Sequence, residues 1–314
     1  MNNIIARFNE LVPSALPFVE GKLEGHKERK NYSIVGPGVA EDSKQFIKIA
    51  KPHGFNLGAV SAMPKNGSGL HSHTTAEVFI IYSGSWRFYW GAEGKNQTIL
   101  NEGDIISMPT NMFRGFENAG DKEGLIFVVL GEDDPGIITW VPEVLDKAKK
   151  TGMALLDDNS LIDLSKNKIP EGRKLLEPIN QEQINKFENF NLDQIQPYIS
   201  KIKNRLEFEK NIGEQLKLNQ ILGNKFEKEN FNPLIEQHTG FNLTVLKGTK
   251  GKVENLSFEK STILFSQKGN WEIIIDDKKY NLSAKDTLSV PVNSKVNISI
   301  NNQEISFLNC VSKL

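Results

Sequence analysis

The chain has a single cysteine, Cys310, in 314 residues, so an intrachain disulfide is excluded. No apolar run approaches the roughly 18–20 residues of a membrane span, and Arg, Asn, Glu and Pro interrupt the apolar N-terminal pieces, unlike the core of a signal peptide. Neither charge is in excess, with 38 Lys and Arg against 39 Asp and Glu. Glycine patterns typical of phosphate or dinucleotide sites are missing, as is a helix-turn-helix segment. These absences predict a cytoplasmic protein that binds neither membranes nor nucleic acid.

The chain contains an internal repeat. GFNL at 54–57 recurs at 240–243, and GDIISMPTN at 103–111 aligns with KDTLSVPVN at 285–293. The offset in residue number between the aligned segments changes by only a few residues over more than a hundred positions. This consistency indicates two copies of one domain.

Each copy has the sequence pattern of an all-β domain, because short alternating or apolar runs are separated by Gly, Asn, Asp and Pro. We expect an N-terminal barrel over 1–140 that carries the functional site, a partly helical connector over 141–200 and a C-terminal barrel over 201–314. Within the connector, 141–152 and 180–202 have apolar residues at helical spacing.

The stretch GLHSHTTAEVFIIYSG, residues 69–84, places His71, His73 and Glu77 two and four positions apart. In one continuous strand these even separations would direct all three side chains to the same face. The opposite face, with Val78 and Ile80, is also apolar, which predicts that a second sheet or a partner covers it.

Two imidazoles and a carboxylate inside a barrel need polar or charged partners, since unpaired buried polar groups are unfavourable. A divalent cation supplies it, because imidazole and carboxylate are good ligands for Fe, Mn, Ni and Zn. A site with two histidines and one carboxylate also leaves coordination positions open for substrate or oxygen.

These residues resemble the first motif of the cupins, with His71, His73, Glu77 and Gly84 in place, and GDIISMPTNMFRGFEN (103–118) resembles the second. The resemblance implies two jelly-roll barrels of the RmlC-like kind, similar to the bicupin quercetinases, gentisate dioxygenases and oxalate decarboxylases. It also implies His71, His73 and Glu77 as metal ligands. Two departures stand out in the second motif. Asn111 replaces a glycine, and Arg114 replaces the fourth metal ligand.

The second copy lacks these ligands. The positions of His71, His73 and Glu77 fall on Leu256, Phe258 and Thr262, and that of Arg114 falls on Val296. The second barrel is therefore expected to be degenerate, with one metal per chain.

Arginine cannot ligate a metal, because its guanidinium has only donors and stays protonated. Three roles for Arg114 remain open. It could clamp a substrate carboxylate while the metal activates the same molecule. It could instead point at Glu77, neutralise it and leave two histidines with a weak or empty site. In the third role it swings outward and leaves the position to water.

The expected function is that of a metal-dependent enzyme for a small organic anion, with Arg114 and Glu77 as catalytic residues. Dioxygenase chemistry is preferred, by likeness to the bicupin oxygenases. A non-redox isomerase, lyase or decarboxylase, with Glu77 as base, is the alternative, and a non-enzymatic binding protein is a third possibility. Cupins commonly dimerise, so a homodimer is also an expectation. Among the other histidines, His53 and His238 are expected to have structural roles and His26 to lie at the surface.

Overall fold

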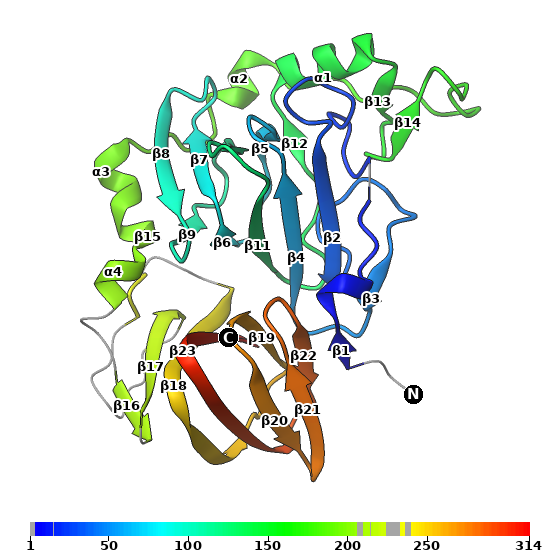
Figure 1. The fold of residues 1–314 in the computed structure, drawn as a ribbon. Coiled ribbons are helices and arrows are strands. Elements are labelled where there is room, and N and C mark those ends of the chain that lie inside the picture. The colour runs from blue at the N-terminus through cyan, green and yellow to red at the C-terminus, as the bar shows by residue number, and fades with distance from the viewer. Residues whose placement is uncertain (1–3, 15, 206–209, 214, 224–232, 236–239) are drawn as a thin grey trace.

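The protein consists of two β-barrels, one above the other in Figure 1, joined by a partly helical segment that runs along the outside of the first. The computed structural model describes residues 4–14, 16–205, 210–213, 215–223, 233–235 and 240–314. The predicted all-β class with two jelly-roll barrels is confirmed.

The first barrel is made of two facing sheets. One has the strand order β12-β5-β10-β7-β8, and the other has the order β15-β9-β6-β11-β4-β2-β3. Their strands are β2 (Arg29–Val35), β3 (Ile47–Ile49), β4 (Phe55–Ala62), β5 (Gly67–Ser72), β6 (Glu77–Ser83), β7 (Ser85–Trp90), β8 (Asn96–Asn101), β9 (Ile105–Met108), β10 (Arg114–Asn118), β11 (Gly124–Gly131), β12 (Thr139–Trp140) and β15 (Ile199–Ser200).

The second barrel is one strongly curved sheet with the main order β1-β22-β19-β23-β18-β17-β16, to which β20 and β21 add. Its first strand comes from the N-terminus of the chain, so residues ahead of the first barrel complete the second. Its strands are β1 (Ile5–Ala6), β16 (Lys210–Gly213), β17 (Leu216–Leu222), β18 (Phe241–Ser257), β19 (Thr262–Lys268), β20 (Trp271–Ile275), β21 (Lys278–Leu282), β22 (Thr287–Val290) and β23 (Lys295–Lys313).

The connector carries the helices that the sequence indicated. Helix α1 (Pro142–Lys150) begins at a proline and ends before Gly152, whose φ of +84° suits a glycine. A two-stranded sheet follows, of β13 (Met153–Leu155) and β14 (Leu161–Asp163). The remaining helices are short: α2 (Gln181–Ile184), α3 (Leu192–Ile195), α4 (Ile202–Arg205) and the 3-10 turns η1 (Phe8–Glu10) and η2 (Gln196–Tyr198). No helix of the described residues has the length and apolar character to cross a membrane.

The two barrels share a hydrophobic core. Val78 and Ile80 of β6 belong to a buried cluster that includes residues of the second barrel, whereas Phe79 and Ile81 face the interior of the first. The rings of Phe127 and Phe265 lie 4.9 Å apart across this interface. The prediction that β6 is covered on both faces is confirmed, and the cover is the second barrel.

Candidate metal centre

His71, His73 and Glu77 come together from two sheets. The prediction of one continuous strand is wrong, because β5 ends at Ser72 and β6 begins at Glu77. His73 lies in the turn between them, and the two strands belong to different sheets. The turn carries the chain across the barrel, so the three side chains converge from facing walls.

Both histidines present the same ring nitrogen to the site. His71 Nδ1 lies 2.8 Å from the carbonyl oxygen of Gly69, and His73 Nδ1 lies 3.2 Å from that of Thr75. We therefore assign the proton to Nδ1 in both rings, which leaves the Nε2 atoms as acceptors; that of His73 lies 2.8 Å from Arg114 Nη2. Burial, reinforced by Arg114, lowers the pKa of His71 to about 4 and also lowers the pKa of His73. Both imidazoles are thus neutral at pH 7, as a metal requires.

Glu77 is the negative member of the site. Burial alone would raise its pKa, but the Arg114 guanidinium beside it acts in the opposite direction, and the pKa of Glu77 is lowered. Its Oε2 lies 3.2 Å from His73 Nε2. Two ligands held at about 2.1 Å by one octahedral ion are about 3.0 Å apart, so this separation suits a shared cation.

The donor set therefore fits a divalent cation. Donor atoms of His71, His73 and Glu77 all lie within 4.8 Å of one another, and this is the one such group in the described part of the chain. Two acceptors that face each other, Nε2 of His73 and a carboxylate oxygen, also call for a positive charge beside them.

In this structure, the guanidinium of Arg114 supplies that positive charge. It is fully buried at the start of β10, paired with His71 of β5. Its Nε donates to Glu77 Oε2 at 3.1 Å, and its Nη2 lies 2.8 Å from His73 Nε2. Its Nη1 donates to the carbonyl of Met112 at 2.9 Å. This orientation is that of the second alternative above, in which Arg114 neutralises Glu77 and leaves a weak or empty metal site.

The register of the second barrel supports the repeat alignment. Leu256 pairs with Val296 there, as His71 pairs with Arg114 in the first barrel. Thr262 also occupies the place of Glu77, since it pairs with Val290. The side chains that stand in for the triad line a cavity of about 560 Å³ with largely apolar walls.

A small cavity adjoins two of the three donor residues in the first barrel. Its volume is about 80 Å³, and His71 and Glu77 are part of its lining. Phe79, Phe116 and Leu130 give it an apolar wall. Its polar lining includes Ser68, Asn31 and Arg29.

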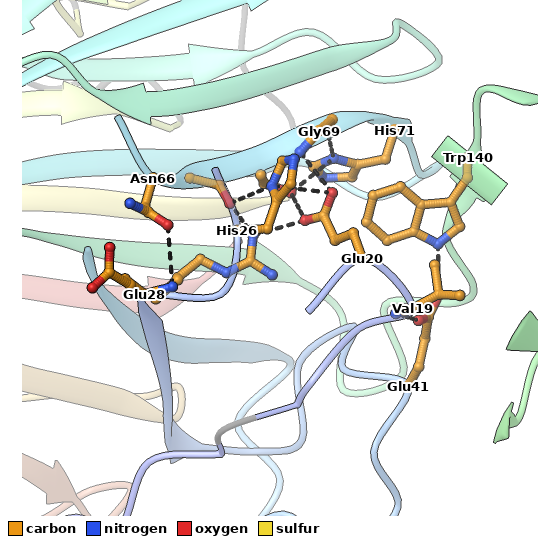
Figure 2. A network of polar contacts seen from close by, with 12 residues as sticks. Val19, Glu20, His26, Glu28, Glu41, Asn66, Gly69, His71 and Trp140 are labelled. Carbon is orange, nitrogen blue, oxygen red and sulfur yellow. Dashed lines mark hydrogen bonds and ion pairs between the residues drawn. The ribbon is translucent and has the colours of Figure 1, made fainter. Parts of the chain in front are cut away.

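Sequence reasoning missed two buried charged residues beside the histidines. Glu20 accepts hydrogen bonds from Ser68 Oγ at 3.0 Å and from Gly69 N–H at 2.8 Å, and Arg29 Nη1 donates to it at 2.8 Å. Figure 2 shows Glu20 between His26 and the Gly69–His71 segment. Burial would raise the pKa of Glu20, but Arg29 and His26 lower it, so the group is charged. Glu20 interrupts the run LPFVEG, and this lone acid among apolar residues was the available signal.

The expectation for His53 agrees with the structure, whereas that for His26 does not. His53 Nε2 lies 2.8 Å from Ser289 Oγ, so this ring joins the two barrels. His26 was expected at the surface, but it is half-buried and its Nδ1 lies 2.9 Å from the Gly67 carbonyl. His238 lies outside the described residues. Asn111 has a φ of +54°, which explains how it replaces the glycine of the motif.

Comparison with known proteins agrees with this architecture. Residues 59–130 match the family model described as the cupin domain. Among solved structures, the chain is similar to the oxalate decarboxylase of Lactobacillus farciminis in its formate complex, with 14% identity, a TM-score of 0.60, and 100% of this chain and 86% of that chain covered.

Two structures of the Bacillus subtilis oxalate decarboxylase are also similar. A mutant of that enzyme, and a structure reported for its Mn(II) centres, each match with 13% identity, a TM-score of 0.57, and coverage of 100% of this chain and 78% of the other. At this identity the likeness shows the fold. No curated protein sequence matches the chain.

Proposed function

We propose that this chain, a two-barrel cupin, is a metal-dependent enzyme that acts on a small organic acid without net redox change, as in decarboxylation. The observation that carries the proposal is the convergence of two neutral imidazoles and an ionised carboxylate, whose donor atoms lie within 4.8 Å of one another, beside a small cavity. His71, His73 and Glu77 would hold the ion.

The charge of the site favours an anionic substrate. With a divalent ion bound, Glu77 offsets one positive charge while Arg114 adds one, so two positive charges stay uncompensated. Buried charges are tolerated when they are paired, and an organic anion would provide the pairing.

The cavity favours a small substrate. Its volume of about 80 Å³ is well below the roughly 300–1,000 Å³ of pockets that hold drug-sized ligands. Flavonols and other large aromatic substrates of cupin oxygenases would not fit without rearrangement. Acids of a few non-hydrogen atoms would, and the similar structures named above are oxalate decarboxylases.

When bound, the metal would supply a Lewis acid that polarises a carboxyl or carbonyl oxygen of the substrate. The chain would supply the rest. Glu77 stays ionised at neutral pH, so it would offer a negative charge to the ion. Arg114 would position Glu77 through its 3.1 Å hydrogen bond, and the apolar wall would exclude water.

The dioxygenase route stays the second candidate, because two histidines and one carboxylate also suit Fe(II). It would hold the same ion through the same residues. It ranks second because its aromatic substrates exceed the cavity.

The test begins with metal analysis of the purified protein after reconstitution with Mn(II), Fe(II), Ni(II) or Zn(II). Less than about a tenth of an equivalent of any of these ions would end the proposal. The loaded protein is then supplied with oxalate and glyoxylate while CO₂ release and oxygen uptake are recorded. We expect CO₂ without oxygen uptake. Oxygen uptake with gentisate and Fe(II) would instead establish the dioxygenase.

His71→Ala should abolish both metal binding and turnover. The matched control is His53→Asn, which removes a histidine that contacts the second barrel and lies outside the donor set. This control should retain both properties.

A further inference from the structure

The interior of the second barrel contains a cavity much larger than that of the first. Its volume is about 560 Å³, against about 80 Å³ beside His71 and Glu77. Residues of β17, β18, β19 and β23 form most of its walls. This volume falls within the roughly 300–1,000 Å³ of pockets that hold small organic ligands.

Three aromatic rings fill the corresponding space in the first barrel. The ring centroids of Phe79, Phe88 and Phe116 lie between 5.0 and 6.2 Å from one another. Phe116 pairs with Phe88 between β10 and β7, and Phe79 lies two residues after Glu77 on β6. Little volume is therefore left beside the histidines.

Aliphatic side chains take the places of these rings in the second barrel. Ile298 pairs with Ile273 between β23 and β20, in the register of the two phenylalanines above. Leu264 lies two residues after Thr262, the counterpart of Glu77. All three are smaller than phenylalanine, and both Leu264 and Ile298 line the cavity. The loss of three rings therefore opens this interior.

The walls of the cavity are mainly apolar and incompletely covered. They include five large apolar side chains that are only partly buried: Ile212, Leu218, Val253, Leu256 and Phe258. Apolar surface in contact with water is unfavourable, so an occupant that covers these side chains would stabilise the barrel. An apolar cavity of about 150 Å³ is already enough to bind benzene.

The charged residues of the lining lie at its rim. Among the described residues that line the cavity, Glu259, Lys260 and Lys313 carry charges, and all three are exposed. The buried polar members, Gln220 and Thr262 among them, are uncharged. The described interior thus presents hydrocarbon walls in place of the imidazoles and carboxylate of the first barrel.

We propose that the cavity of the second barrel binds a mainly hydrocarbon small molecule, an aliphatic chain or ring system, against Leu218, Leu256 and Leu264. The degenerate copy of the repeat has then exchanged a cluster of polar ligands for an apolar binding site. This inference is independent of the proposed function, because the described lining comes from the second barrel alone.

Binding is measured on the full chain with N-phenyl-1-naphthylamine, an uncharged dye whose fluorescence rises in apolar surroundings. We expect saturable binding of about one dye per chain and its displacement by 1-alkanols. From 1-hexanol to 1-decanol, the affinity should rise about threefold to fourfold per added methylene, because each buried methylene adds a similar transfer free energy. Absence of saturable binding, or an affinity that does not rise with chain length, would overturn the proposal.

Two variants locate the dye. Leu256→Trp and Leu218→Trp enlarge partly buried side chains on different strands of the wall, and each should weaken dye binding about tenfold or more. The matched control is Ile99→Trp, at a side chain of the first barrel that is 53% exposed, and should bind as the wild type does. Wild-type affinity in both cavity variants, with the fold checked by circular dichroism, would refute the location.

Cys310 reports on occupancy of the cavity in the wild-type chain, so a result is obtained even if neither variant folds. It is the only cysteine of the sequence, is 8% exposed and lines the cavity. Burial raises the pKa of its thiol to about 12, so its alkylation by N-ethylmaleimide is followed by mass spectrometry at about pH 9. Saturating 1-decanol should slow this reaction about tenfold or more, because it blocks access to the thiol. A rate that 1-decanol leaves unchanged would contradict binding in this cavity.

Discussion

Replacing Arg114 with methionine should make the stability of the first barrel depend on metal. The guanidinium is fully buried and its Nε lies 3.1 Å from Glu77 Oε2. Methionine fills much of the same volume, so the main loss is the positive charge beside a buried carboxylate. Breaking such a pair by removing one partner costs about 3–5 kcal/mol.

The expected change in melting temperature follows from the size of the barrel. A destabilisation of 1 kcal/mol shifts the midpoint of a unit of 150–250 residues by about 2–4 °C, so Arg114→Met without metal should melt roughly 10 °C below the wild type. Metal should then reverse much of the loss, because a dication no longer lies beside a guanidinium. At a free metal concentration of 100 times Kd, binding restores about 2.7 kcal/mol.

The assay is thermal unfolding followed by circular dichroism, after EDTA treatment and across a titration with Mn(II), Ni(II) or Zn(II). Arg87→Met serves as the control, since Arg87 forms a solvent-exposed pair with Glu117. The reasoning is refuted if Arg114→Met without metal is as stable as the wild type. It is also refuted if metal raises the midpoint of the variant no more than that of the wild type.

Three further predictions concern other parts of the chain. Burial raises the pKa of Glu41 to about 8. Its stabilisation is thus fully present below the ordinary carboxyl pKa and is lost as pH rises through 8, so in urea titrations Glu41→Gln should lose less stability than the wild type between pH 5 and 8. Phe265→Ala should cost about 3–5 kcal/mol in denaturant unfolding, because Phe265 packs on Phe127 between the barrels; a loss under 1 kcal/mol would contradict that contact. Gly67→Ala should prevent soluble expression, since its Cβ would lie 1.8 Å from the Phe116 carbonyl oxygen, and a soluble variant with the wild-type melting temperature would refute this.

The repeat and the cluster of His71, His73 and Glu77 could be predicted because both leave local marks in the sequence. The alignment through GDIISMPTN placed Met108 opposite Val290, and the structure pairs these residues with Glu77 and Thr262. The path between the histidines and Glu77 could not be predicted, because a short turn between sheets and a continuous strand give the same residue spacing.

The environment of Arg29 was hidden for a different reason. It lies in HKERKNY, a run of polar and charged residues that is usually exposed, and its partner Glu20 lies nine positions earlier in a segment without regular structure. What buries the pair is the approach of β5, whose Gly67 and Ser68 bond to it. Such a contact depends on tertiary structure and leaves no periodic signal.

The first barrel contains two buried arginines, and each pairs with a different glutamate. Arg114 contacts Glu77, His73 and the Met112 carbonyl, so it sets the charge beside His71, His73 and Glu77. Arg29 stands on another strand of the barrel and pairs with Glu20, its Nη1 lying 2.8 Å from Glu20 Oε1. The two arginines share no hydrogen-bond partner. Substitutions at the two positions should therefore have nearly additive effects on the free energy of unfolding.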